Sequence, residues 1–179
     1  MRLTRWYEQF GYIAQFSPSR RVTQLVVDGR TGQEIDFDNA RPGTGTTLNL
    51  SARLNPTDHL DVALVENTQW VNVDAGAAGS GRLLLARVSR LRGTCTFTAR
   101  LFIRAIAQYV STDRAPALYT SDVVPHEGTL SGQLLLSCKL NWQSVMFVGY
   151  GDDRELSDRD RLDKLDRQFF VKLSYAIQR

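Results

Sequence analysis

The chain has 179 residues, of which 42% are hydrophobic, and its formal net charge at pH 7 is +3. This length suffices for one domain with a substantial core but is short for two. No segment approaches the roughly 18 to 20 consecutive apolar residues that a membrane-spanning helix needs. The arginines are dispersed along the chain, so we expect no nucleic-acid partner. We therefore treat residues 1–179 as a single all-β domain, for the following reasons.

Nine segments have the composition and alternation of β-strands. Several of them are longer than the 5 or 6 residues typical of strands in soluble proteins, and they match the roughly 9 to 11 residues of a membrane-crossing strand. The expected strands, in chain order, are residues 5–16, 20–28, 44–54, 58–71, 82–96, 99–111, 129–141, 144–151 and 167–178.

The segments between these strands are alternately short and long. Short turn sequences occupy residues 17–20, 55–58, 97–99 and 141–144. Longer segments rich in glycine and aspartate occupy residues 29–43, 72–81, 112–128 and 152–166. This alternation predicts an antiparallel up-and-down transmembrane β-barrel with short periplasmic turns and long external loops. Such barrels normally have an even strand number, so we expect about eight strands. Either the first segment is not a full member, or further strands precede it.

Two strands show the clearest division into an apolar and a polar face. In residues 99–110, Leu101, Ile103 and Ala105 share one face, and the other face carries Arg100, Arg104 and Gln108 together with Phe102 and Ile106. Residues 130–141 also divide into an apolar and a polar face. The lumen-facing candidates are Arg53, Asp61, Arg100, Arg104, Gln108, Lys139 and Lys172. These side chains could attract anionic solutes, or they could pair with one another as a structural ladder. We expect the ladder in a narrow barrel, and a wide barrel would favour neither alternative.

The alternation fails in residues 82–92, where three consecutive leucines precede Arg87, Arg90 and Arg92. We expect a β-bulge or a change of environment there. Cys95 and Cys138 fall on the predicted lipid face with one strand between them. Because this places them about 9 to 10 Å apart, beyond disulfide reach, we expect two free thiols.

Aromatic residues fall near the ends of the predicted strands, where membrane barrels carry aromatic girdles. The alternative is that they fill a soluble core. The girdle candidates are Trp6, Tyr12, Trp70, Tyr109, Trp142, Tyr150 and Tyr175.

No pattern indicates an enzyme, a cofactor or a metal. The acidic loop 152–160 lacks the ligand spacing and glycine of a calcium loop, so we expect a solvated external loop. His59 and His126 are the only histidines, and neither accompanies a hydrolase motif. A hydrolytic triad of His126 with a serine or aspartate from an external loop remains the enzymatic alternative.

Several segments resemble the C-terminal region of certain large bacterial proteins. They are Phe10–Tyr12, Ser17–Arg21, Leu140–Ser144, Gly149–Asp153 and Arg167–Tyr175. In those proteins, a domain similar to carbohydrate-binding module family 9 precedes an outer-membrane β-barrel domain of unknown function. The resemblance covers essentially the whole chain. It implies an outer-membrane location and an additional N-terminal portion, and it implies no catalytic residue.

These observations predict a passive scaffold or conduit in the bacterial outer membrane, related to carbohydrate uptake or anchoring. Its partners would be the lipid bilayer (or detergent) and the barrel assembly machinery, which would recognise the aromatic-rich strand 167–178. That strand does not end on the usual aromatic residue, because Ile177 is followed by Gln178 and Arg179. The alternative is a soluble barrel of the lipocalin or avidin type, with apolar side chains inside and a small ligand in the mouth.

Overall fold

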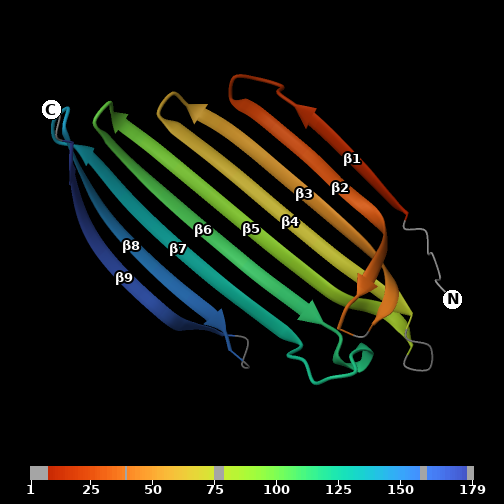
Figure 1. Ribbon diagram of the computed structural model, residues 1–179. Coiled ribbons are helices and arrows are strands. Elements are labelled where there is room, and N and C mark those ends of the chain that lie inside the picture. The colour runs from red at the N-terminus through yellow and green to blue at the C-terminus, as the bar shows by residue number, and fades with distance from the viewer. Residues whose placement is uncertain (1–7, 39, 75–78, 158–160, 177–179) are drawn as a thin grey trace.

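The computed structural model describes residues 8–38, 40–74, 79–157 and 161–176, and these form a single sheet of nine strands. The strands are β1 (Gln9–Phe16), β2 (Val22–Asp36), β3 (Arg41–Thr57), β4 (Leu60–Asp74), β5 (Ser80–Thr98), β6 (Leu101–Arg114), β7 (His126–Lys139), β8 (Ser144–Leu156) and β9 (Leu162–Tyr175). A 3-10 helix, η2 (Pro116–Leu118), lies between β6 and β7. Each strand pairs antiparallel with the next along the chain, in one layer (Figure 1). The predicted antiparallel meander is confirmed.

The sheet is open, with β1 and β9 as its two edges (Figure 1). Closure into a barrel therefore remains a prediction. The first predicted segment is a full member of the sheet, because β1 pairs with β2 along its whole length, from Gln9 with Gly32 to Phe16 with Leu25. The sheet thus has nine strands rather than about eight.

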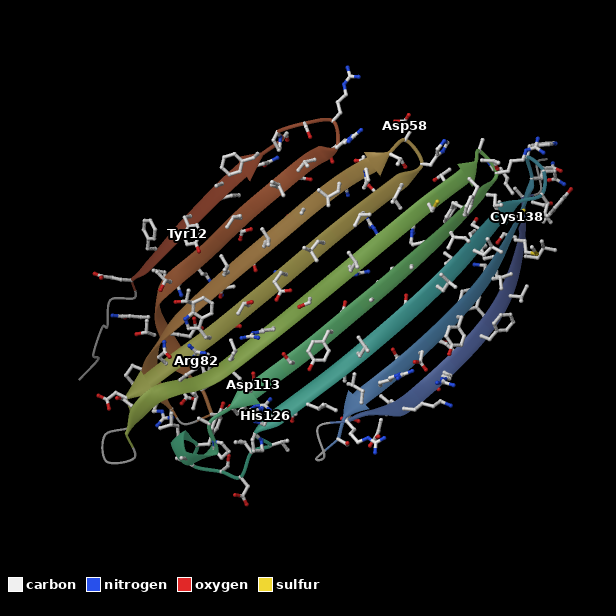
Figure 2. All side chains as sticks on the ribbon, turned by 180° about the vertical axis from the view of Figure 1, so that it is seen from behind. Tyr12, Asp58, Arg82, Asp113, His126 and Cys138 are labelled. Carbon is white, nitrogen blue, oxygen red and sulfur yellow. The ribbon has the colours of Figure 1, made fainter. Side chains whose placement is uncertain are left out.

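The connections at residues 17–21, 58–59, 99–100 and 140–143 all lie at one end of the sheet, which we call the turn end (Figure 1). At the opposite end, which we call the loop end, β2, β4, β6 and β8 end and β3, β5, β7 and β9 begin. Figure 2 shows Asp58 and Cys138 near the turn end, whereas Arg82, Asp113 and His126 lie at the loop end. The predicted placement of all tight turns at one end is confirmed.

The predicted long loops are mostly strand. Residues 29–36 extend β2, and most of 152–166 belongs to β8 and β9. Glycine and aspartate have low strand propensity, but pairing with neighbouring strands overrides it. Gly32 pairs with Gly45, and Asp152 pairs with Arg167 and forms an ion pair with it. Among the connections that are described in full, 115–125 is the longest.

The strands are staggered relative to one another. Tyr150, the seventh residue of β8, lies in one row of paired residues with Leu134, Ala105, Gly93 and Val62. Val62 is the third residue of β4. From β8 to β4, this row of paired residues therefore moves toward the turn end by about one residue per strand. With a rise of about 3.3 Å per residue and a strand spacing of about 4.8 Å, this stagger corresponds to a tilt of about 35°, which is within the range of closed barrels.

A small apolar cluster covers the loop end of one face. Leu118 of η2 packs with Val71 and Val73 of β4 and with Leu83 of β5, and all four are buried. Leu83 is the extra residue of a β-bulge, because Val71 pairs with Leu84 and the next residue, Asn72, pairs with Arg82. The bulge expected within residues 82–92 is confirmed.

Candidate functional site

The register divides the side chains of the sheet into two faces. Residues paired across antiparallel strands lie on the same side, so each row of the register can be assigned. Six of the lumen-facing candidates share one side, which we call the polar face: Arg53, Asp61, Arg104, Gln108, Lys139 and Lys172. Arg100 lies in the turn between β5 and β6 instead of in a strand.

The opposite side, the apolar face, carries large hydrophobic residues on every strand. Representative members are Phe16, Leu25, Leu54, Leu64, Leu91, Leu101, Leu134, Val148 and Leu173. Leu134 is 49% exposed and Leu173 is 66% exposed. Nothing in the described chain covers these side chains, and a contiguous exposed apolar surface marks a membrane or protein contact.

The predicted girdle residues lie on the apolar face or at its ends. Tyr12 lies across Gly29, where a Cβ atom would be 2.6 Å from the Tyr12 hydroxyl oxygen. Trp142 lies in the turn between β7 and β8 and Tyr175 ends β9, both exposed at the turn end. Trp70, Tyr109 and Tyr150 lie further along their strands on the apolar face, and Trp6 is outside the described residues.

The last three aromatic residues do not form a level ring. Trp70 is ten residues from the start of β4, Tyr109 is eight residues from the start of β6, and Tyr150 is six residues from the start of β8. The three therefore follow an oblique line that approaches the turn end toward β9. A girdle remains a prediction.

A shallow groove on the polar face extends from β2 to β5 and is lined by three arginines. Its cavity volume is about 260 Å³, and its polar lining comprises Gln24, Ser51, Arg53, Arg90 and Arg92. One carboxylate, Asp61, lies beside it, 4.0 Å from Arg53 Nε and 3.7 Å from Arg92 Nη2. We call this set of residues the arginine groove.

Arg90 and Arg92 were not predicted as candidates. Arg87, which is close to them in sequence, pairs with Thr68 on the apolar face, and the bulge at Leu83 reverses the alternation before it. For this reason, the alternation of apolar and polar residues did not show on which face Arg90 and Arg92 lie. Counting back from Cys95, which alternates regularly with Thr94, would have placed both arginines on the polar face.

Other polar side chains on this face form short hydrogen-bonded chains. Asn67 Nδ2 donates to Asn49 Oδ1 at 2.7 Å, and Asn49 Nδ2 donates to Asp28 Oδ2 at 2.7 Å. Arg104 Nε donates to Thr94 Oγ1 at 3.3 Å, and the Arg104 guanidinium lies 5.5 Å from the centre of the Phe102 ring. These contacts join polar side chains of neighbouring strands, and the ladder of charged residues remains a prediction.

The loop end of the polar face is held by the connection between β6 and β7. Arg41 pairs with the buried Asp36 at 2.8 Å, and it also donates to the Leu118 carbonyl oxygen. Burial in this region raises the pKa of Tyr119 above its ordinary value. The connection thus folds over the polar face and leaves the apolar face uncovered.

The structure brings together a histidine and an aspartate, two of the three side chains that a hydrolytic triad needs. His126 Nδ1 lies 2.6 Å from Asp113 Oδ1, at the loop end of the apolar face. Ser111 is two residues from Asp113 on the same face, but no hydroxyl–histidine hydrogen bond is present in the described residues. His59 lies in the turn between β3 and β4, at the opposite end of the sheet. A hydrolytic triad therefore remains a prediction.

The described residues contain no cluster of histidine, cysteine and carboxylate side chains that could hold a metal ion. The acidic segment 152–160 is partly outside the described residues, and within them Asp152 is paired with Arg154 and Arg167. Cys95 and Cys138 are free, with β6 between their strands, as predicted.

No protein-family model matches the chain, and neither a curated protein nor a solved structure matches it. The likeness to the barrel region of large bacterial proteins therefore rests on the sequence segments given above. Within the described residues, no helix is long and apolar enough to cross a membrane.

Proposed function

We propose that the chain forms part of the wall of a bacterial outer-membrane β-barrel that acts as a scaffold or passive conduit for carbohydrate-related material. The observation that carries this proposal is the division between the two faces. On β6 and β7 the apolar runs Leu101–Tyr109 and Leu130–Cys138 have the length of a membrane-crossing strand. The apolar face would contact lipid, and the polar face would line the interior.

Three further features support this arrangement. All nine strands are neighbours in chain order, which is the topology of membrane barrels. The stagger corresponds to the tilt that closure requires. The connection 115–125 packs on the polar face, as loops do when they fold into a barrel lumen. The barrel assembly machinery would recognise β9, and the edge β1 would join strands of an N-terminal portion.

Two groups of polar residues on the apolar face do not fit a uniform lipid contact. Asp152 of β8 and Arg167 of β9 form an ion pair in the half of these strands toward the loop end. Glu66 lies in mid-strand on β4, and Ser89 and Arg87 lie beside it on β5. Polar side chains within the bilayer are costly, and they usually contact protein or water. In the proposed barrel, this part of β4 and β5 therefore contacts another protein surface or extends its polar groups toward the membrane boundary.

The soluble lipocalin-like alternative places the apolar face inside. The two arrangements are distinguished by a fluorophore at adjacent positions of β7. In a background with Cys95→Ser and Cys138→Ser, bimane would be attached to Leu134→Cys or to Gln133→Cys, and the protein would be refolded into phosphatidylcholine vesicles. We expect brominated lipid to quench the label at 134 and aqueous iodide to quench the label at 133. Absence of lipid quenching at 134 would contradict the proposal.

A further inference from the structure

We propose that the arginine groove binds a small oxyanion, such as a phosphate, a sulfate or the carboxylate of an acidic sugar. This inference adds a class of solute to the proposed conduit function. The physiological role of the site rests on that proposed function. It assigns the contacts to Arg53, Arg90 and Arg92.

The register brings the three guanidinium groups together. Arg53 and Arg92 both pair with Ala63, which lies between them on β4. Because alanine has only a methyl side chain, the two long side chains can lie over it from either side. Arg90 belongs to the next row, beside Val65 and Ser51. The hydroxyl of Ser51 and the amide of Gln24 add uncharged donors to the lining.

The groove has more positive charge than its own carboxylate can balance. Asp61 lies 4.0 Å from Arg53 Nε and 3.7 Å from Arg92 Nη2, both well beyond the 2.7 to 2.9 Å of a charge-assisted hydrogen bond. Arg92 Nε is buried and has no hydrogen-bond partner. A buried unpaired donor is costly, and an oxyanion in the groove would provide its acceptor.

The structural ion pairs elsewhere in the sheet show that this geometry is unusual for the protein. Asp36 lies 2.8 Å from Arg41, and Asp152 lies 2.8 Å from Arg154 and 2.6 Å from Arg167. In both places each arginine meets its carboxylate at hydrogen-bond distance. The arginine groove differs because its donors remain available. It therefore has the character of a binding site rather than of a closed ladder.

Isothermal titration calorimetry on the full chain in detergent tests the site with inorganic phosphate, D-glucuronate and, as a neutral control, D-glucose. We expect binding of phosphate or glucuronate and none of glucose. Arg92→Gln should weaken binding about tenfold, which corresponds to the loss of one charge-assisted contact. Arg30→Gln is the matched control, since Arg30 lies on the polar face outside the groove, and it should change affinity less than twofold.

A second variant gives an effect of opposite sign. Asp61→Asn removes the carboxylate that competes with the ligand, so it should tighten binding several-fold. Weaker binding in Asp61→Asn, equal affinity of Arg92→Gln and the unsubstituted chain, or binding of neither anion would overturn the inference. Binding of phosphate alone or of both anions supports it and identifies the preferred source of the oxyanion.

This measurement is independent of the membrane test. Lipid quenching at position 134 without anion binding would leave the conduit proposal standing and reject the site. Anion binding without lipid quenching would reject the membrane proposal and keep the site.

Discussion

Leu134 and Gln133 are neighbours on β7, yet they belong to surfaces that are organised in opposite ways. On the polar face, side chains of neighbouring strands form hydrogen bonds in mid-strand, as in the Asp28–Asn49–Asn67 chain. On the apolar face, the side-chain hydrogen bonds of the described residues lie mainly in the half of the strands toward the loop end, as between Thr31 and Thr46 and between Arg167 and Asp152. The polar face therefore has side-chain contacts of its own along the middle of the strands, whereas the apolar face leaves large hydrophobic side chains exposed.

The largest expected effect comes from placing a charge on the apolar face. Leu134→Arg should lower the free energy of unfolding in phospholipid vesicles by about 2 to 4 kcal/mol, the cost of an arginine facing lipid near the bilayer centre. Gln133→Arg, the same charge change on the polar face, should change it by less than about 1 kcal/mol. Denaturant titration of both variants measures the difference. Equal destabilisation would mean that the two faces have the same environment.

Glycine positions provide a second comparison of the faces. Gly149 lies on the polar face under the Phe170 ring, and a Cβ atom there would collide with the ring. Gly149→Val should therefore destabilise the protein by about 1 to 3 kcal/mol. Gly93→Val on the apolar face should be neutral or slightly stabilising, because no atom lies within 4 Å of the added Cβ. Thermal unfolding in detergent would show whether the two substitutions differ.

The hydrogen-bonded chain of the polar face predicts a smaller, graded effect. Asn49→Ala removes two hydrogen bonds and should cost about 1 to 2 kcal/mol, whereas Asn67→Ala removes one and should cost about half as much. Denaturant midpoints at constant m-value measure the ratio. Equal costs for the two variants would indicate that the hydrogen bond from Asn49 to Asp28 contributes nothing to stability.

The smallest effect is expected for the hydroxyl pair near the loop end of the apolar face. Thr31 Oγ1 and Thr46 Oγ1 lie 2.8 Å apart. Replacing both residues by valine should change stability by less than about 0.5 kcal/mol, because both partners are removed together. A double-mutant cycle with the two single variants tests this expectation. A loss above about 1 kcal/mol would show that polar contacts on this face also carry stability.

Much of the sheet could be predicted from the sequence because alternation directly reports the two faces of a strand. Residues 99–111 and 129–141 are examples, since their apolar and polar sets correspond to the two faces of β6 and β7. The strand extensions were missed because composition alone does not reveal pairing. Gly32 and Asp152 look like loop residues until their cross-strand partners are known.

The candidate site was predictable only in part, for a related reason. Arg53, Asp61 and Arg104 lie in regularly alternating segments and were identified. Arg90 and Arg92 lie between the bulge at Leu83 and the regular segment that ends β5. A bulge changes the side toward which every preceding residue points, and its position depends on register with β4. Arg53 of β3 and Arg92 of β5 come together because both pair with Ala63 of β4, and the sequence alone does not show this register.

The two edge strands have a thermodynamic consequence for any membrane-embedded form. Along the outer side of β1 and β9, backbone amide and carbonyl groups have no neighbouring strand within the part of the chain that the structure describes. Each such group costs several kcal/mol in hydrocarbon. Ile13 of β1, 74% exposed, and Phe170 of β9, 46% exposed, are apolar side chains on the polar face at these same edges. Membrane insertion and the pairing of the two edge strands must therefore occur as one cooperative event. An inserted intermediate with unpaired edge strands should not accumulate during refolding.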